Sequence, residues 1–430
     1  MYALKETDTS VLKDLLENKD IRLLDVRSID AYNGWPIQGE ARGGHIKGAR
    51  TLPEKWLDYP EWPNILQFKH ILQDDIIVVY GYTLEESRKT ALQLVEHGYS
   101  NVSVYNGFLA EWSADDSLPM EKLANYRQLV SPEWVRMLIS GGTPLAYGND
   151  RFVLCHGHYR NRDAYLSGHI PGAIDMDTLA LESPDTWNRR SPAELKAALE
   201  QHGITADTTV VLYGKFMHPD NADDFPGSAA GHIGAIRLAF IMMYAGVKDV
   251  RVLNGGYRSW VDAGFEISTE DVPKKPVAEF GADIPARPEL AVDTPEAKNM
   301  IKSEDEDIIC VRSYPEYIGE VSGYNYIKMK GRIPGAVFAD CGSDAYHMQN
   351  YRNLDHTTRE YHEIADIWEH SGIVPEKHLA FYCGTGWRGS EAWFNALVMG
   401  WPRVSVYDGG WFEWSNDPDN PYETGEPKGN

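Results

Sequence analysis

Cysteine is scarce in this chain, which has only four in 430 residues, at positions 155, 310, 341 and 383. None of them forms a Cys-x-x-Cys pair, which argues against a disulfide framework or a zinc ribbon. No apolar run approaches the roughly 18 residues that cross a bilayer, and residues 1–17 lack the basic start and apolar centre of a secretory signal. We therefore expect no membrane association and a cytoplasmic protein, or a periplasmic one if a signal peptide has been removed.

Positive charge is also in short supply. The chain has 41 Lys and Arg against 64 Asp and Glu, which gives a formal net charge of −23. A field of this sign repels phosphates, so nucleic acid is not an expected partner. Hydrophobic residues make up 43% of the chain, which is enough for several cores.

The most informative segment is Cys383-Gly384-Thr385-Gly386-Trp387-Arg388. Before it, residues 379–382 have the apolar pattern of a buried strand, and residues 389–399 have that of a helix. A cysteine between a strand and a helix start lies among backbone N–H groups without intrahelical partners, which favour an anionic sulfur. Two glycines allow a tight turn, and Arg388 adds positive charge.

Two other interpretations of this segment are weaker. An inert cysteine before an ordinary glycine turn does not explain why strand, glycines, arginine and helix occur together. A cysteine phosphatase loop has five residues between Cys and Arg, whereas four separate Cys383 from Arg388. The smaller loop suits a sulfur atom on the cysteine better than a phosphate beside it.

The segment resembles the active loop of the rhodanese family of sulfurtransferases, a six-residue turn that begins with the catalytic cysteine. Residues 404–407 read as a strand, and Asp408-Gly409-Gly410-Trp411 with Trp414 is typical of the end of a rhodanese module. Upstream, Cys310-Val311-Arg312 stands where the family usually has Asp-x-Arg, and Arg332 stands in place of a His in Gly-His-Ile-x-Gly-Ala.

Related motifs occur twice more. The first third has Asp25-Val26-Arg27 and Gly44-His45-Ile46-Lys47-Gly48-Ala49, and the middle third has Gly168-His169-Ile170-Pro171-Gly172-Ala173. Aligning the central strands places Gly81 and Gly214 where Cys383 stands, so we expect the first two copies to be catalytically silent. The middle copy carries an insertion of 15 positions between Gly214 and Gly255.

The resemblance and the alternation of strand and helix predict an α/β protein with three tandem rhodanese-like domains, each a parallel sheet flanked by helices. We place them at residues 1–120, 121–275 (with the insertion) and 285–425. The Pro-rich stretch from Val272 to Pro288 would be the linker into the third. Ligands of such sheets bind beyond the carboxyl ends of the strands, where Cys383 would lie.

No cofactor or metal is expected. Cys155, His156 and His158 form a Cys-His-x-His cluster, but ordinary strand-end residues are the favoured interpretation. Cys341 has a structural role in our interpretation, in preference to that of a resolving thiol.

The resemblance implies a sulfurtransferase that works by double displacement. Cys383 takes the outer sulfur of thiosulfate, and the resulting persulfide passes it to a thiophilic acceptor. The expected substrate-binding residues are Gly384, Thr385, Gly386, Trp387, Arg388 and Gly389 of the loop, together with Arg312.

Individual roles follow for three of these residues. Arg388 would contact the loop or the incoming anion, Trp387 would gate access or dock a protein acceptor, and Arg312 would help bind the donor.

Two alternatives for the function stay open. Mercaptopyruvate sulfurtransferases share the Cys-Gly-(Ser/Thr)-Gly opening, although they usually continue Val-Thr-Ala where this chain has Trp387-Arg388-Gly389. A sulfur carrier or scaffold loaded by a cysteine desulfurase would give the two silent copies a docking role. A protein sulfur donor or acceptor is therefore a possible partner beside the small-molecule donor.

Overall fold

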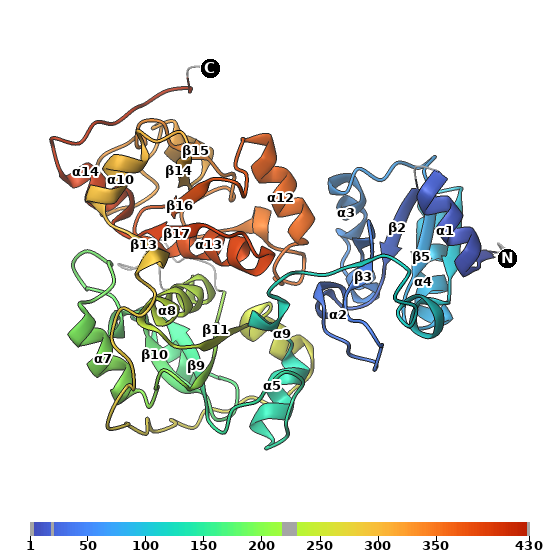
Figure 1. Cartoon of the computed structure of the whole chain (residues 1–430), viewed down its shortest axis with the longest axis horizontal. Helices are drawn as coiled ribbons and strands as arrows, with labels where there is room; N and C mark the ends of the chain where they lie inside the picture. Colours follow the sequence, from blue (N-terminus) through green and yellow to red (C-terminus); the bar gives the residue numbers. More distant parts are fainter. Residues whose placement is uncertain (1–3, 19–20, 217–229, 428–430) are drawn as a thin grey trace. The chain divides into compact units, whose positions relative to one another are not determined.

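The computed structural model describes residues 4–18, 21–216 and 230–427. The chain divides into two compact units, Met1–Arg127 and Gln128–Asn430 (Figure 1). Residues 217–229 of the predicted insertion lie outside the described part. Within that part, no helix combines the length and the apolar character needed to cross a membrane.

The first unit contains one module with a five-stranded parallel sheet in the order β1-β6-β5-β2-β4. Its elements are β1 (Lys5–Thr7), α1 (Thr9–Asn18), β2 (Ile21–Asp25), α2 (Ile29–Asn33), β3 (His45–Ile46), β4 (Arg50–Thr51), α3 (Trp62–Phe68), β5 (Ile76–Tyr80), α4 (Leu84–Glu96), β6 (Val102–Tyr105) and β7 (Met120–Glu121). The short strands β3 and β7 pair antiparallel outside that sheet.

The second unit begins with a middle module whose sheet has the order β10-β9-β11-β12-β8. Its elements are β8 (Leu129–Val130), α5 (Pro132–Ile139), β9 (Phe152–His158), α6 (Arg162–Leu166), β10 (Ile174–Asp177), α7 (Pro192–Gln201), β11 (Thr209–Gly214), α8 (Gly231–Ala245), β12 (Asp249–Leu253) and α9 (Gly256–Asp262).

The third module completes the second unit, with a sheet in the order β13-β17-β16-β14-β15. Its elements are β13 (Ala291–Val292), α10 (Thr294–Met300), β14 (Glu306–Cys310), α11 (Tyr314–Tyr317), β15 (Val337–Phe338), α12 (Tyr361–His370), β16 (His378–Tyr382), α13 (Trp387–Met399), β17 (Val404–Tyr407) and α14 (Gly410–Asn416).

The three sheets share one topology: numbered within each module, the strands lie in the order 1-5-4-2-3 and all pairs are parallel. The central strands are apolar and buried, as in Thr209–Gly214, because helices cover both faces of such a sheet. The predicted α/β fold with three repeated parallel sheets is confirmed.

Neighbouring strands β16 and β14 form the switch point of the third sheet. The chain leaves β16 through α13 toward β17, and it leaves β14 in the other direction toward β15. A crevice opens beyond the carboxyl ends of two such strands, and ligands of open α/β sheets bind there. Cys383 directly follows β16.

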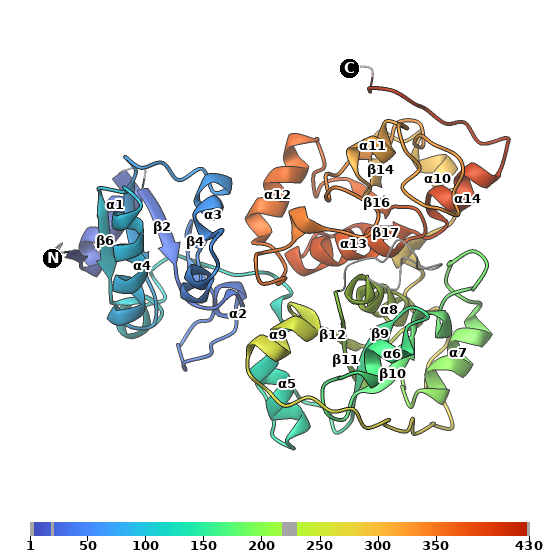
Figure 2. The same cartoon turned by 180° about the vertical axis from the view of Figure 1, so that it is seen from behind.

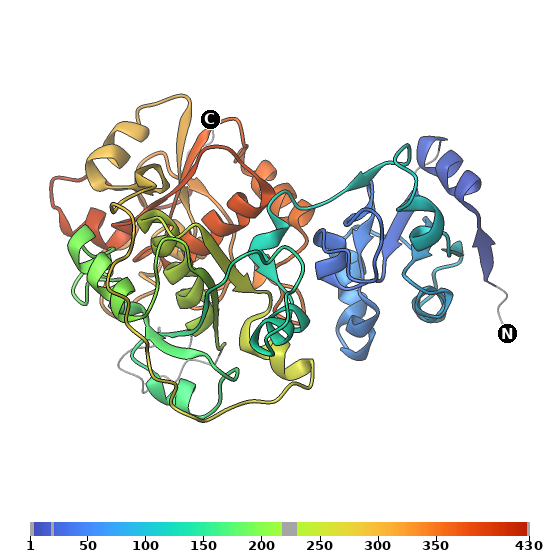
Figure 3. The ribbon, with the colours of Figure 1, turned by 60° about the horizontal axis from the view of Figure 1, so that its bottom comes forward.

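Within the second unit, helices α8 and α13 pack against each other between the sheets of the middle and third modules (Figures 1 and 2). The Pro-rich segment after α9 runs along the middle module (Figure 3). There the Val277 N–H donates to the Glu200 carbonyl, and the Ala206 N–H donates to the Phe280 carbonyl. The predicted boundaries at 275 and 285 fall inside this compact unit and stay a prediction.

Candidate active site

The register of the three sheets identifies the equivalent positions of the copies. Tyr80 pairs with Asp25, Tyr213 pairs with His156, and Tyr382 pairs with Cys310. The next residue along each central strand is Gly81, Gly214 or Cys383 respectively. Among these three positions a thiol is therefore present only in the third module.

The loop after Cys383 leads directly into helix α13. Gly386 has φ of +87°, a left-handed conformation that glycine adopts without strain, and the helix begins at Trp387. The first-turn N–H groups of an α-helix such as α13 have no intrahelical partner. Cys383 itself is 1% exposed. A thiol between a strand end and a helix start is placed as the sequence predicts for an anion cradle, and the cradle itself stays a prediction.

In the other two modules, the positions equivalent to Cys383 leave little room for a charged sulfur. In the first module, one carboxylate oxygen of Glu86 accepts the N–H groups of Tyr82 (2.9 Å) and Thr83 (3.0 Å), so those donors are already used. In the middle module, a Cβ atom added at Gly214 would lie 2.2 Å from the Gly231 carbonyl oxygen. A cysteine at position 214 would require the backbone to move.

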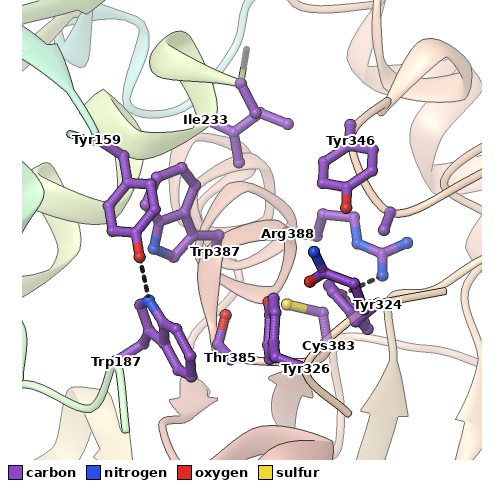
Figure 4. Close-up of a pocket in the computed structure, with 13 residues that line it drawn as sticks. Tyr159, Trp187, Ile233, Tyr324, Tyr326, Tyr346, Cys383, Thr385, Trp387 and Arg388 are labelled. Atoms are coloured by element: carbon purple, nitrogen blue, oxygen red, sulfur yellow. Dashed lines mark hydrogen bonds between the residues drawn. The ribbon is translucent and has the colours of Figure 1, made fainter. Parts of the chain in front are cut away.

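A pocket surrounds the Cys383 sulfur within the second unit (Figure 4). Tyr159, Trp187 and Trp387 stand on one side of it, and Tyr324, Tyr346 and Arg388 stand on the other. The middle module lines it with Tyr159, Trp187, Ala230 and Ile233, and the third module with Tyr324, Asn325, Tyr326, Ala345, Tyr346, Cys383, Thr385, Trp387 and Arg388. Aromatic rings dominate this lining.

Arg388 is brought to the pocket, but its charge is compensated. Its guanidinium donates to both carboxylate oxygens of Glu316, at 2.8 and 3.0 Å, and to the Asp344 carbonyl at 2.9 Å. Burial alone would favour a neutral Glu316, yet the adjacent Arg388 lowers the pKa of that carboxyl. The pair is therefore ionised. The negative charge of Glu316 offsets the positive charge that Arg388 would otherwise present to an incoming anion.

Tyr324 lies between Arg388 and the start of the loop. Its hydroxyl oxygen accepts hydrogen bonds from the Gly384 N–H, at 3.0 Å, and from the Arg388 guanidinium. With both lone pairs engaged, the phenolic proton is left to point elsewhere. Burial raises the pKa of Tyr324 well above its usual range, so the phenol stays protonated at neutral pH. Tyr324 thus offers a protonated hydroxyl, able to donate a hydrogen bond, in the pocket that Cys383 lines.

Arg312 is not among the residues that line the pocket. It is fully buried, its Nε lies 3.3 Å from the Cys310 sulfur, and it donates to the Gly331 carbonyl at 2.6 Å. In the first module, the equivalent Arg27 pairs with Asp25. The structure therefore packs Arg312 against the Trp411 ring and the Cys310 sulfur. It does not place Arg312 in the lining of the pocket that contains Cys383.

Trp387 points toward the middle module. Its indole Nε1 donates to both carboxylate oxygens of Glu182, at 3.0 and 3.1 Å. The edge-to-face partner of its ring is Tyr159, with centroids 5.4 Å apart. The sequence-based roles of gating access or docking a protein partner assume a projecting side chain, whereas this one is fixed inside the unit.

A buried charge network supports Glu182. Arg237 of α8 donates to Glu182 at 2.8 Å and also bonds Asp408 of the third module. Asp408 belongs to the Asp-Gly-Gly-Trp motif and accepts from the Arg189 side chain as well, at 2.8 Å. Burial raises the pKa of Glu182 to about 7, against the opposing effect of Arg237.

The other three cysteines do not line the pocket, although the Cys341 sulfur lies 3.9 Å from an Arg388 guanidinium nitrogen. Burial raises the pKa of Cys341 to about 12, so it is a protonated thiol at neutral pH, which suits the expected structural role. Cys155 and His156 are consecutive residues of strand β9, so their side chains point to opposite faces of the sheet. His158 instead pairs with Asp175.

Sequence reasoning missed most of the pocket wall. Tyr324 and Tyr326 lie in a coil between α11 and β15, and Glu182 and Trp187 lie in the middle module, far from Cys383 in sequence. The one signal in the sequence was the tyrosine-rich run Tyr324-Asn325-Tyr326, which lies between Arg312 and Gly331.

Solved structures provide one comparison. The wild-type structure of EanB and its complexes with ergothioneine and with hercynine share 72% sequence identity with this chain, with a TM-score of 0.97. They cover 99% of this chain, which in turn covers 99–100% of theirs. One EanB structure carries a cysteine persulfide in a tetrahedral intermediate state with ergothioneine.

Curated sequences provide another. Thiosulfate sulfurtransferase YnjE of Escherichia coli is 40% identical over 418 residues, which are 96% of this chain and 91% of YnjE. Sulfur carrier protein TtuD of Thermus thermophilus is 30% identical over 69% of this chain and 97% of TtuD. The rhodanese-like domain model matches residues 8–115, 159–263 and 293–417. The chain therefore belongs to the rhodanese family of sulfurtransferases and carries the rhodanese-like domain three times.

Proposed function

We propose that this protein transfers a sulfane sulfur, through a persulfide on Cys383, to the imidazole ring of hercynine and so forms ergothioneine. The third module alone of the three would carry the reacting cysteine. The observation that carries the proposal is the aromatic, charge-compensated pocket around the Cys383 sulfur. Likeness to EanB, with its hercynine and ergothioneine complexes, supports the choice of acceptor.

The pocket fits a betaine better than a small anion. Hercynine carries a quaternary ammonium group, and such groups bind among aromatic faces through cation–π attraction. Tyr159, Trp187, Trp387, Tyr324 and Tyr326 supply rings at this pocket. Arg388, the cation of the loop, is held by Glu316 at 2.8 Å, so it does not repel the ammonium group as a free cation would.

The reaction balances without an external oxidant. The Cys383 thiolate first takes the outer sulfur from a sulfane donor such as thiosulfate, and sulfite leaves. In the second step, that sulfur bonds to the ring carbon between the two imidazole nitrogens and the sulfur–sulfur bond breaks. The ring carbon loses its proton, and Cys383 returns as a thiol. Covalent catalysis thus divides one transfer into two.

The chain's own residues have separate roles in this scheme. First-turn N–H groups of α13 stabilise negative charge on the sulfur as it develops. The Tyr324 phenol, protonated and next to the loop, donates a hydrogen bond or a proton to the imidazole as the carbon–sulfur bond forms. Thr385 lines the same pocket and offers a second hydroxyl to the ring.

A second candidate is thiosulfate sulfurtransferase activity toward a small thiophilic acceptor such as cyanide. YnjE, a relative of nearly the same length, bears that name. Both candidates use the same loaded Cys383 and differ only in the acceptor, so they can be separated with one preparation of the persulfide form.

The test begins with intact-mass spectrometry of the reduced protein after incubation with thiosulfate or polysulfide. We expect the wild type and Cys341→Ala to gain one sulfur atom, and Cys383→Ser to gain none. The loaded protein is then mixed with hercynine or with cyanide, and ergothioneine and thiocyanate are measured.

Formation of ergothioneine together with loss of the added sulfur mass is the expected result. Thiocyanate without ergothioneine would replace the proposed function with the second candidate. Sulfur uptake by Cys383→Ser would contradict the role of Cys383 in both.

A further inference from the structure

The active loop of the third module is completed by the middle module. Trp387 follows Gly386 in the loop, yet its indole hydrogen bond runs to Glu182, 205 residues earlier in the chain. The ring also borders the pocket that contains Cys383 (Figure 4). One face of the candidate acceptor site therefore depends on a residue outside the module that carries the thiol.

Glu182 is held firmly enough to orient that ring. It is fully buried, and its two carboxylate oxygens share the Trp387 N–H. Arg237, also fully buried, donates to one of them and is anchored at its other end by Asp408. A carboxylate that is buried and bonded on two sides has one orientation available, which is the arrangement that fixes a partner side chain.

Packing confines the indole in a slot beside helix α8. A Cβ atom added at Gly234 of α8 would lie 3.1 Å from the Trp387 ring, which is closer than ordinary van der Waals contact. Tyr159 meets the ring at 88°. With Gly234 behind it and Tyr159 at its edge, the ring has little freedom except rotation out of the slot, and the bond to Glu182 opposes that rotation.

We propose that Glu182 is a positioning residue for sulfur transfer: it fixes the Trp387 indole as a wall of the acceptor site, so the middle module sets which acceptor reaches the Cys383 persulfide. The identity of the acceptor used below rests on the proposed function. A merely structural role for Glu182, as a partner for buried Arg237, makes a different prediction, because it does not act through Trp387.

A double-mutant cycle separates the two roles. Loss of one buried hydrogen bond corresponds to at most about a tenfold effect. We therefore expect Glu182→Ala and Trp387→Phe each to raise the KM for hercynine about tenfold, more than they lower kcat. The double variant should be no worse than either single one. Glu182→Gln, whose amide oxygen still accepts the indole N–H, should restore most of the affinity, and the exposed Glu270→Ala serves as the control.

A second readout needs no acceptor. In a protein labelled with ¹⁵N-tryptophan, the indole resonance of Trp387 is assigned by its loss in Trp387→Phe. We expect slow hydrogen exchange of this N–H in the wild type and in Glu182→Gln, and fast exchange in Glu182→Ala. Trp387→Phe leaves the Glu182–Arg237 pair intact, so its KM for hercynine reports on the loss of the bond even where Glu182→Ala does not fold.

Additive effects of the two substitutions on KM, or an indole that stays protected in Glu182→Ala, would overturn the proposal. Failure of the wild type to convert hercynine contradicts the proposed function alone, and the indole exchange then decides the role of Glu182.

Discussion

The buried ion pair between Arg388 and Glu316 decides what the residues around Cys383 can bind. Both side chains are at most 1% exposed and meet through two hydrogen bonds. Two compensated charges leave the neighbouring Tyr324 phenol and the aromatic rings to define the chemistry of the pocket. Removal of one partner leaves an uncompensated buried charge, which is far more destabilising than loss of a surface pair.

We expect Glu316→Gln to lower the free energy of unfolding of the second unit by about 3 kcal/mol. It should also reduce sulfur transfer, because Arg388 and with it Tyr324 lose their fixed positions. Urea-induced unfolding followed by circular dichroism measures the first effect. The exposed neighbour Glu320→Gln is the control, and an unchanged midpoint in Glu316→Gln would contradict the prediction.

For individual residues, the sequence predicts a shared role only where the residues are close together in the chain. Cys383, its glycines and Arg388 form one run, so their common role follows from spacing alone. Glu316 and Glu182 reach the same loop from 72 and 205 residues away. Only tertiary packing brings such partners together, and for this reason the compensation of Arg388 and the fixed Trp387 could not be predicted.

Helix α4 of the first module shows how a related element becomes unreceptive to an anion. Thr83 and Glu86 form a capping box at its start, and the Glu86 carboxylate also bonds the Tyr82 N–H. A carboxylate therefore already occupies the N–H groups that would hold a charged sulfur. The first module lacks a thiol at Gly81, and two backbone donors next to that position are already bonded to Glu86.

A thiol introduced at Gly81 should therefore not, by itself, enable the first module to take up sulfur. In a Cys383→Ser background, we expect Gly81→Cys to gain no sulfur from thiosulfate, because the Glu86 carboxylate repels an anion there and contacts the new Cβ at 2.9 Å. Adding Glu86→Ala should make uptake detectable by intact mass, whereas adding the exposed Glu85→Ala should not. Sulfur uptake by Gly81→Cys alone would show that the Glu86 carboxylate, bonded to the Tyr82 and Thr83 N–H groups, does not prevent sulfur binding in the first module.

Elements with strong local patterns were predicted well. Strand β17 has the predicted bounds, Val404–Tyr407. Helix α13 begins at Trp387, two residues before the predicted start, because Gly386 in the left-handed region ends the loop early. The coil that carries Tyr324 has no periodic pattern, so its place over the pocket depends on tertiary contacts alone.

At the scale of the whole molecule, the candidate site belongs to one compact unit. Every residue that lines the pocket falls within Gln128–Asn430. TtuD, which aligns with 69% of this chain over nearly its entire length, is a shorter relative of this family. We therefore expect the first module to be dispensable for the geometry around Cys383.

We expect a chain that starts at Gln128 to fold, to gain one sulfur atom at Cys383, and to transfer sulfur within about twofold of the full-length rate, since about twofold corresponds to less than 1 kcal/mol. A chain that starts at residue 285 lacks Glu182 and Gly234 and should transfer sulfur poorly. Comparison of both truncated proteins with the full chain, by mass spectrometry and product formation, checks this division. Loss of sulfur uptake in the first of them would contradict it.

The slot formed by Gly234 and Glu182 also constrains how the molecule can change over time. The middle copy has no thiol at the position equivalent to Cys383, so its own loop is free to change in sequence. On the proposed role of Glu182, a substitution at the slot would move a ring beside the sulfur of the third module. Exchange of the middle module for that of another family member would therefore alter the choice of substrate while leaving the nucleophile untouched. Selection on sulfur transfer at Cys383 would therefore also act on the middle module, which has a glycine at the equivalent position.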